Sequence, residues 1–234
     1  MPPRTALALA LTLPLVGCDS DSSDGDPGGQ GAGASTGPGA TAGAGMSTGS
    51  VGTPCAGAEQ HSGEATYYDF ADGSGNCGFP ATPGDLMVAA INHPQYANSA
   101  ACGACARVTG PNGSVDVRIV DRCPECPAGD LDLSPEAFSE IAELSAGRVP
   151  ITWEFIACPV SGPVIFHFKD GSNEYWTAVQ MRNHRHAIAS LAYQDGGGAF
   201  VDVERLDYND FVEPAGMGPC PYTFRITDVA GNTL

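Results

Sequence analysis

The segment Asp19–Pro54 confines the fold of this chain to the residues that follow it. The segment contains no aromatic residue, no Lys and no Arg, and it consists mainly of Gly, Ala, Ser, Thr and Pro with four Asp near its start. Such a composition cannot bury enough apolar surface to offset the entropy of ordering the chain. We therefore predict a disordered, flexible linker over residues 19–54 and a folded part over Cys55–Leu234.

The residues before this linker resemble a bacterial export signal with a lipid attachment site. Arg4 is followed by the apolar run Thr5–Val16, which has the length of a signal peptide and is too short to span a bilayer. Cys18 follows directly in a Leu-Val-Gly-Cys sequence that resembles a lipobox. We predict a lipoprotein signal over residues 1–18, with an ordinary secretory signal as the alternative. The protein is then exported, and it is either held at the cell envelope or surface through lipidated Cys18 or secreted. The lipid anchor is its only expected contact with a membrane.

The charge of the chain argues against polyanionic partners. It carries 27 Asp and Glu against 10 Lys and Arg, a net charge of −17. Four of the acidic residues and one basic residue precede Cys55, so the folded part keeps 23 and 9, a net charge of −14. Because such a chain lacks a surface that neutralises phosphates, we expect no nucleic-acid partner.

Eight cysteines follow Cys18, and the export signal determines their interpretation. Two Cys-x-x-Cys pairs separated by 17 residues match the spacing of a zinc ribbon. An even number of cysteines in an exported chain instead favours disulfides. We therefore predict disulfides, no metal and no cofactor, although eight cysteines allow 105 pairings. The eight are Cys55, Cys77, Cys102, Cys105, Cys123, Cys126, Cys158 and Cys220.

The pattern of apolar residues predicts a chain made mainly of short strands. In the first part, strands are expected at Gly63–Tyr68, Ser114–Val120 and Val149–Ile156. A helix is expected over Ser134–Leu144, with Ser134 as its N-cap and Pro at its first position. After Cys158 the pattern is entirely strand-like, which is typical of a small β-sandwich. The strands expected there are Val164–Phe168, Trp176–Arg182, Ile188–Tyr193, Phe200–Leu206 and Tyr222–Thr227.

Five motifs carry a resemblance to a known family. They are Gly63–Tyr68 (GEATYY), Val120–Cys126 (VDRCPEC), Asp130–Phe138 (DLDLSPEAF), Tyr175–His184 (YWTAVQMRNH) and Leu206–Phe211 (LDYNDF). In this order the motifs resemble those of bacterial expansins, and the resemblance covers Glu64–Leu234. It implies a mainly β protein in which a six-stranded double-psi β-barrel (residues 55–159) is followed by an immunoglobulin-like β-sandwich (residues 160–234). The second domain would be a family 63 carbohydrate-binding module.

Two carboxylates stand out in the first domain. Asp121 ends a predicted strand and Asp132 precedes the predicted helix, and two carboxylates that meet in one groove can perform acid–base chemistry. The alternative is that Asp132 accepts N–H groups near the helix start and that Asp121 holds the loop of Arg122. The resemblance implies that Thr66, Asp121 and Asp132 are the functional residues of the barrel, and Asp132 also matches the general acid of the related family 45 hydrolases. Tyr68 is assigned to substrate binding.

The same comparison argues against hydrolysis. In family 45 hydrolases a base follows the Thr by four residues, where this chain has Phe70, and Asp69 lies one residue short. Adjacent side chains of a strand point to opposite faces, so Asp69 is a poor base. Cys123 stands where the bacterial prototype has a glucan-binding Tyr. Three hypotheses remain: an expansin that loosens cellulose networks without measurable hydrolysis, an endoglucanase, and a binding-only adhesin.

The resemblance also implies a set of disulfides. Cys77–Cys102 and Cys105–Cys158 correspond to barrel disulfides of plant expansins. Cys123 could then pair locally with Cys126, which would leave Cys55 with Cys220.

In the second domain the resemblance implies an aromatic binding strip. Tyr175, Trp176 and Tyr208 match its three aromatic positions, and Lys169 lies beside them. Neighbouring residues of a regular strand point to opposite faces, so Tyr175 and Trp176 both face a ligand only if one of them lies in the preceding turn. The alternative is that one is exposed and the other belongs to the core.

Four basic residues cluster at the end of the fourth motif and just after it. Arg182, His184, Arg185 and His186 have no carboxylate or Cys at ligand spacing, so we predict a solvated strand and turn rather than a metal or anion site. The expected partners are cellulose, a xyloglucan-like or other cell-wall polysaccharide, or peptidoglycan. We expect a monomer.

Overall fold

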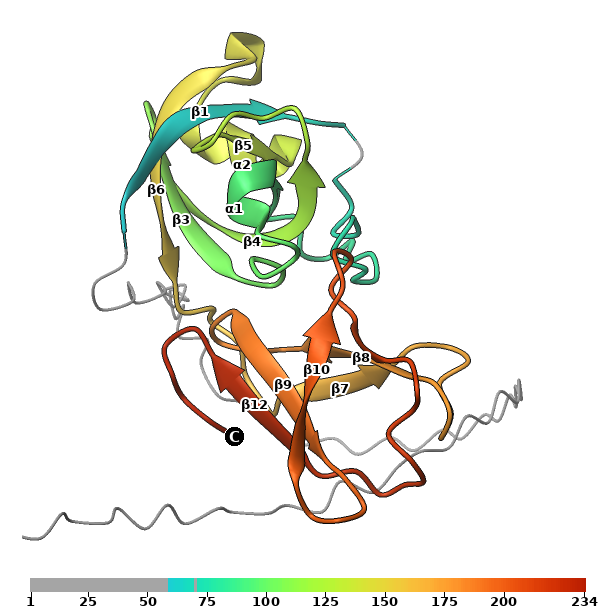
Figure 1. Ribbon diagram of the computed structural model, residues 1–234. Coiled ribbons are helices and arrows are strands. Elements are labelled where there is room, and N and C mark those ends of the chain that lie inside the picture. Colours follow the sequence, from blue (N-terminus) through green and yellow to red (C-terminus); the bar gives the residue numbers. More distant parts are fainter. Residues whose placement is uncertain (1–58, 70) are drawn as a thin grey trace, which may run out of the picture.

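The computed structural model describes residues 59–69 and 71–234, which form a β-barrel and a second β-domain in contact with each other (Figure 1). The predicted signal (1–18), the predicted linker (19–54) and Cys55 lie outside the described residues. Within the described part of the chain, no helix is long and apolar enough to cross a membrane.

The first domain is a closed barrel of six strands in the order β1-β5-β2-β4-β3-β6. The pairs β1/β5 and β2/β4 are parallel, and the others are antiparallel. The sequence predicted β6 correctly and β1 and β4 in part, but it missed three short strands, of which β2 is buried at every residue. The strands are β1 (His61–Tyr67), β2 (Val88–Asn92), β3 (Cys105–Gly110), β4 (Gly113–Cys123), β5 (Leu131–Leu133) and β6 (Val149–Ile156).

The predicted helix is confirmed but shorter than expected. Helix α2 covers Pro135–Ile141, and the hydroxyl of its N-cap Ser134 accepts a hydrogen bond from the Ala137 N–H at 3.0 Å. Phe138 and Ile141 are buried in the barrel core. A separate 3-10 turn, η1 (Leu144–Ala146), follows the helix, so Leu144 lies outside it and is exposed. A short helix, α1 (His93–Tyr96), follows β2.

The second domain is a six-stranded sheet that curls around its own core. Its order is β12-β9-β10-β11-β8-β7, and the two outermost strands meet where Phe166 stacks on Phe224 with ring centroids 4.9 Å apart. The core of the sheet includes Val179, Leu191 and Phe211. The sequence missed β11, which has only three residues. The strands are β7 (Ile165–Phe168), β8 (Thr177–Arg182), β9 (Ile188–Gln194), β10 (Phe200–Arg205), β11 (Phe211–Glu213) and β12 (Phe224–Asp228).

Three of the expected disulfides are present. They are Cys77–Cys102, Cys105–Cys158 and Cys123–Cys126. Cys105 belongs to β3, and Cys158 lies just after β6, so their bond ties the end of the barrel to the connection that leads into the second domain. Cys220 is disulfide-bonded as well; its expected pairing with Cys55 stays a prediction.

Candidate functional site

Strand register aligns the predicted barrel residues in one row. Thr66 on β1 pairs with Asp132 on β5, Asp132 pairs with Ala90 on β2, and Ala90 pairs with Asp121 on β4. Neighbouring strands lie about 4.8 Å apart, so the Cα atoms of the two aspartates lie about 9–10 Å apart. Ala90 stands between them and contributes only a methyl group. Its position comes from register, so no sequence signal singled it out.

The Asp132 carboxyl is held by Thr66. The Thr66 hydroxyl donates to Asp132 Oδ1 at 2.6 Å. Burial raises the pKa of Asp132, the nearby charges of Glu125 and Asp121 raise it further, and the bond from Thr66 and the charge of Arg148 oppose them. The carboxyl therefore keeps its proton to a higher pH than an exposed Asp, as a general acid requires. Because Asp132 lies within β5 and bonds Thr66, it does not cap the helix.

The Asp121 carboxyl accepts two backbone N–H groups through one oxygen. Oδ1 lies 2.7 Å from the Asn76 nitrogen and 2.8 Å from the Arg122 nitrogen. Asp121 therefore does hold the chain at Arg122, as the alternative interpretation proposed, and it also binds a loop 45 residues away in sequence. These two donors fix the orientation of the Asp121 carboxylate at the end of the row.

Tyr68 adds a buried hydroxyl beside the two carboxylates. Its N–H donates to the Leu133 carbonyl at 3.1 Å, just beyond the end of β1. Its hydroxyl is buried, and no described residue forms a hydrogen bond with it. Burial raises the pKa of Tyr68, and the charges of Asp121, Asp132 and Asp72 raise it further. A neutral, buried hydroxyl without a partner is suited to donate to a ligand oxygen. No sequence pattern singled out Asp72, because its position depends on the loop after β1.

Asp69 lies just beyond the end of β1, and Cys123 is the last residue of β4. Asp69 lies in an exposed turn beyond β1, so strand alternation does not decide its direction. Phe70 lies outside the described residues. Cys123 is buried in its disulfide with Cys126. The closed loop between these two cysteines carries Glu125, whose charge acts on Asp132.

In the second domain, Tyr175 and Trp176 both precede β8. The Tyr175 N–H donates to the Asn173 side-chain oxygen at 2.9 Å, and the Asn173 N–H donates to the Trp176 carbonyl at 2.7 Å. These bonds close a tight turn. Tyr175 is 74% exposed and Trp176 is partly exposed. Because both residues precede the strand, the alternation of strand side chains does not place the two rings on opposite faces.

The segment after β11 holds this turn in place through two hydrogen bonds. The Gly218 N–H donates to the Glu174 carbonyl at 3.2 Å, and the Met217 N–H donates to the Thr177 hydroxyl at 3.2 Å. Gly216 has a φ of +76°, and a Cβ there would lie 2.0 Å from the Glu174 carbonyl oxygen. Only glycine permits this close approach.

Tyr208 and Lys169 form a second aromatic position. The Lys169 ammonium lies 5.1 Å from the centre of the Tyr208 ring and 2.7 Å from Asp210 Oδ2. Tyr208 is 36% exposed, whereas Asp210 is 4% exposed. A pocket of about 360 Å³ is lined by Lys169 and Tyr208 on one side and by Gly75 and Asn76 of the barrel on the other. It lies between the barrel loop that holds Asp121 and Tyr208 of the second domain.

The prediction that the basic cluster Arg182–His186 is solvated is wrong at His184. Arg185 is exposed, but His184 is buried, and its Nδ1 lies 2.8 Å from the His186 carbonyl oxygen. Burial lowers the pKa of His184 to about 4, so it is neutral at pH 7. Among the described residues, no group of three or more His, Cys, Asp or Glu is arranged to hold a metal ion.

Comparison with known proteins agrees with this architecture. A family model described as lytic transglycolase matches residues 60–153, which make up most of the barrel. Expansin-YoaJ of Bacillus subtilis is 32% identical over 178 residues, 74% of this chain and 76% of that protein. Expansin-like protein 1 of Dictyostelium discoideum is 33% identical over 183 residues, 73% of this chain and 63% of that protein.

Solved structures agree over both domains. The apo expansin of Clavibacter michiganensis aligns with a TM-score of 0.71 and 35% identity over 75% of this chain and 89% of that one. A mutant of the same expansin in complex with cellohexaose aligns with a TM-score of 0.70 and 34% identity over the same shares. The fold is therefore that of a two-domain protein with a double-psi β-barrel and a curled β-sheet domain. The chain belongs to the expansin family.

Proposed function

We propose that this protein binds cellulose or a related β-1,4-glucan and loosens cell-wall polysaccharide networks without hydrolysis. The observation that carries the proposal is the row Thr66–Asp132–Ala90–Asp121, in which a carboxyl with a raised pKa lies two strands from a carboxylate held by backbone donors. Such a row can disrupt hydrogen bonds between glucan chains by exchanging protons and hydrogen bonds with sugar hydroxyls.

The second domain supplies the affinity in this proposal. Tyr175, Trp176 and Tyr208 offer aromatic faces that stack on the apolar faces of sugar rings, with Lys169 beside them. The similar Clavibacter expansin is described in complex with cellohexaose, which supports a glucan as the ligand class. A xyloglucan-like polysaccharide and peptidoglycan are further partners to test. We also propose that the protein acts outside the cell, held by lipidated Cys18.

Three measurements on the purified protein test this function together. Binding isotherms on crystalline cellulose, xylan and peptidoglycan identify the polymer. The extension of cellulose paper under constant load measures loosening, and release of reducing sugar from soluble glucan measures hydrolysis. We expect binding to cellulose and extension of paper without sugar release. Sugar release that accounts for the extension would replace the proposal with an endoglucanase, and binding without extension would replace it with an adhesin.

A further inference from the structure

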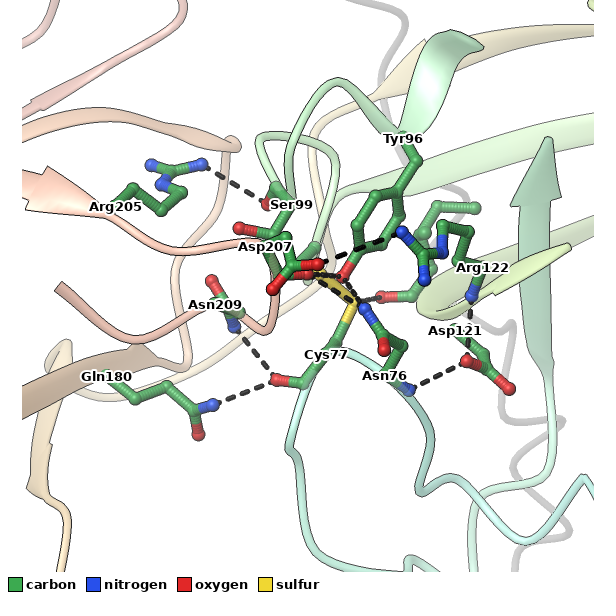
Figure 2. The surroundings of a disulfide bond; sticks show 12 residues. Asn76, Cys77, Tyr96, Ser99, Asp121, Arg122, Gln180, Arg205, Asp207 and Asn209 are labelled. Carbon is green, nitrogen blue, oxygen red and sulfur yellow. Dashed lines mark hydrogen bonds and ion pairs between the residues drawn. A yellow bond between two sulfur atoms is a disulfide. The ribbon is translucent and has the colours of Figure 1, made fainter. Parts of the chain in front are cut away.

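We propose that the segment Gly75–Cys77 positions the Asp121 carboxylate relative to the second domain, with Asn76 as the positioning residue. The segment contacts the barrel row on one side and the turn that carries Tyr208 on the other (Figure 2). The functional part of this inference rests on the proposed function, whereas its structural part does not.

On the barrel side, the segment touches Asp121 directly. The Asn76 N–H donates to Asp121 Oδ1 at 2.7 Å. Gly75 packs so closely that a Cβ there would lie 2.5 Å from the Asp121 Cβ and 2.7 Å from the Val120 carbonyl oxygen. A displacement of this segment would therefore remove one of the two backbone donors of the carboxylate and the close packing against Asp121.

On the other side, the segment is fastened to the second domain by side-chain amides. Asn76 Nδ2 donates to the Asp207 carbonyl at 2.8 Å and to the Tyr96 hydroxyl at 2.7 Å. The Tyr96 hydroxyl in turn donates to the same Asp207 carbonyl at 2.7 Å. These three groups form a closed triangle of hydrogen bonds across the boundary between the domains (Figure 2).

The next residue makes a second set of bonds across the same boundary. The Cys77 carbonyl accepts from Gln180 Nε2 at 2.9 Å and from Asn209 Nδ2 at 3.2 Å. Cys77, Gln180 and Asn209 are all buried, so losing either bond while the domains stay in contact would leave a buried amide N–H without a partner. The disulfide to Cys102 anchors Cys77 within the barrel.

The turn Leu206–Asp210 completes the connection. Asn209 adopts a φ of +69°, which Asn tolerates better than most residues, and its N–H closes the turn on the Leu206 carbonyl at 3.1 Å. Tyr208 stands in this turn between Asp207 and Asn209, the two residues that bond the segment. Tyr208 and Asp121 are therefore held in a fixed relation through one short segment of chain.

The decisive variant is Asn76→Ala. It removes both side-chain bonds of Asn76 and leaves the backbone donor to Asp121 chemically unchanged. Asn98→Gly is the matched control. Asn98 Nδ2 also bonds the second domain, at 3.2 Å from the Arg205 carbonyl oxygen, but Asn98 makes no bond to the segment, and glycine accepts its φ of +53°.

The first readout is structural and needs no assumption about function. Nuclear magnetic resonance measures hydrogen exchange of the amide at position 76 and the ¹³C signal of the Asp121 carboxyl group. We expect Asn76→Ala to speed exchange by about fivefold or more, since each lost bond contributes to keeping the segment in place, and to shift the Asp121 signal. Asn98→Gly should change neither. Unchanged exchange and an unshifted Asp121 signal in Asn76→Ala, or equal changes in both variants, would overturn the proposal.

The second readout separates positioning from binding. We expect Asn76→Ala to lose far more of its extension of cellulose paper than of its cellohexaose affinity, because Tyr175 and Trp176 are untouched and only the turn of Tyr208 is loosened. Asn98→Gly should keep both. Full extension by Asn76→Ala would contradict the functional part. If the wild type itself does not extend paper, the proposed function fails, and the resonance measurements still decide whether Asn76 positions Asp121.

Discussion

In the barrel, the candidate functional residues lie on neighbouring strands and are aligned by register, whereas in the second domain the aromatic residues lie on turns outside the strands. Thr66, Asp132 and Asp121 each occupy a fixed position in a closed barrel. Tyr175 and Tyr208 stand on turns, and both are exposed. A slip of one residue in β5 would turn Asp132 to the opposite face, but a shift of a turn would only tilt a ring.

This contrast suggests a division of roles. A half-buried row can control the protonation of a carboxyl, because burial and neighbouring charges shift its pKa. An exposed set of rings offers area for stacking and responds little to pH. We therefore expect substitutions in the barrel to affect loosening and substitutions in the second domain to affect binding.

The largest expected effect is that of Asp132→Asn. Asn cannot donate a proton to a sugar oxygen, so extension of cellulose paper should be lost, while cellulose binding stays near that of the wild type. Asp116→Asn is a suitable control, because Asp116 is a barrel carboxylate that pairs with Arg107 rather than with the row. Paper extension at the wild-type level by Asp132→Asn would show that Asp132 takes no part in loosening. It would also contradict the proposed division between loosening by the barrel and binding by the second domain.

The raised pKa of Asp132 adds a test by pH. Its protonated form is the one that can donate, so loosening should decline as pH rises through that pKa. Stability should change in the same direction. The folded protein holds this proton more tightly than the unfolded chain, so the contribution of Asp132 is complete below the ordinary Asp pKa and is lost as pH rises through the raised value. Asp132→Asn should remove this part of the pH dependence.

The next effect concerns the aromatic surface. Stacking of a base on an aromatic ring contributes about 1–3 kcal/mol, and on that scale Trp176→Ala should weaken cellulose binding about tenfold. Trp176→Ala combined with Tyr208→Ala should nearly eliminate it, with little dependence on salt. Phe200→Ala is the control, since Phe200 is an exposed ring that packs against Arg225 on β12. A folded double variant that binds like the wild type would move the binding surface elsewhere.

The same contrast explains how much the sequence could predict. The strands β6 and β8 were predictable, because β-branched and apolar runs bounded by turns give a local signal. The aromatic positions Tyr175, Trp176 and Tyr208 came from motifs, and the sequence left open whether Tyr175 and Trp176 are both exposed. Helix α2 was predictable from its N-cap. The short strands β2, β5 and β11 were not, because their pairing depends on partners far away in sequence.

The site followed the same rule. Thr66, Asp121 and Asp132 were proposed from motifs, but their alignment and the position of Ala90 between the aspartates come only from register. Asn76 and Asp72 lie in a loop rich in Gly and polar residues, where sequence offers no preference among them. The buried state of His184 was missed because a polar cluster next to a turn is usually solvated, and here it packs at the boundary between the domains.

His184 tests whether the two regions unfold together. Its ring lies close to Gly103 of the barrel, where a Cβ would lie 2.6 Å from Nε2. Since its pKa is lowered to about 4, the unfolded chain binds a proton that the folded protein does not between about pH 6.5 and 4. Stability should therefore fall by up to about 3 kcal/mol as pH falls through this range.

Thermal unfolding followed at several pH values provides the measurement. His184→Gln should remove most of this acid-dependent loss, whereas His93→Gln, which changes an exposed histidine, should retain it. A single transition that shifts with pH indicates that barrel and second domain unfold as one unit. Two transitions, of which only one shifts, would show that the domains are energetically separate despite their hydrogen bonds.

The smallest expected effect is that of replacing Lys169. This residue is exposed like the aromatic rings, but it also contacts a buried carboxylate. It is an exposed residue beside an aromatic ring, yet its ammonium pairs with the buried carboxylate of Asp210. A partly exposed ion pair contributes up to about 1 kcal/mol, so Lys169→Ala should weaken cellulose binding by at most about fivefold. Lys169→Met keeps the apolar stem near Tyr208 and should lose less, because only the charge is removed.

Combining Lys169→Met with Asp210→Asn separates two possible roles of Lys169. If Lys169 acts by neutralising Asp210 and so keeping the turn of Tyr208 in place, the double variant should recover the binding lost by Lys169→Met, because Asn leaves no buried charge unpaired. If Lys169 acts by direct contact with the glucan, the double variant should bind no better than Lys169→Met. Binding isotherms on cellulose for the four proteins of this cycle decide between an indirect role through the turn and a direct one at the surface.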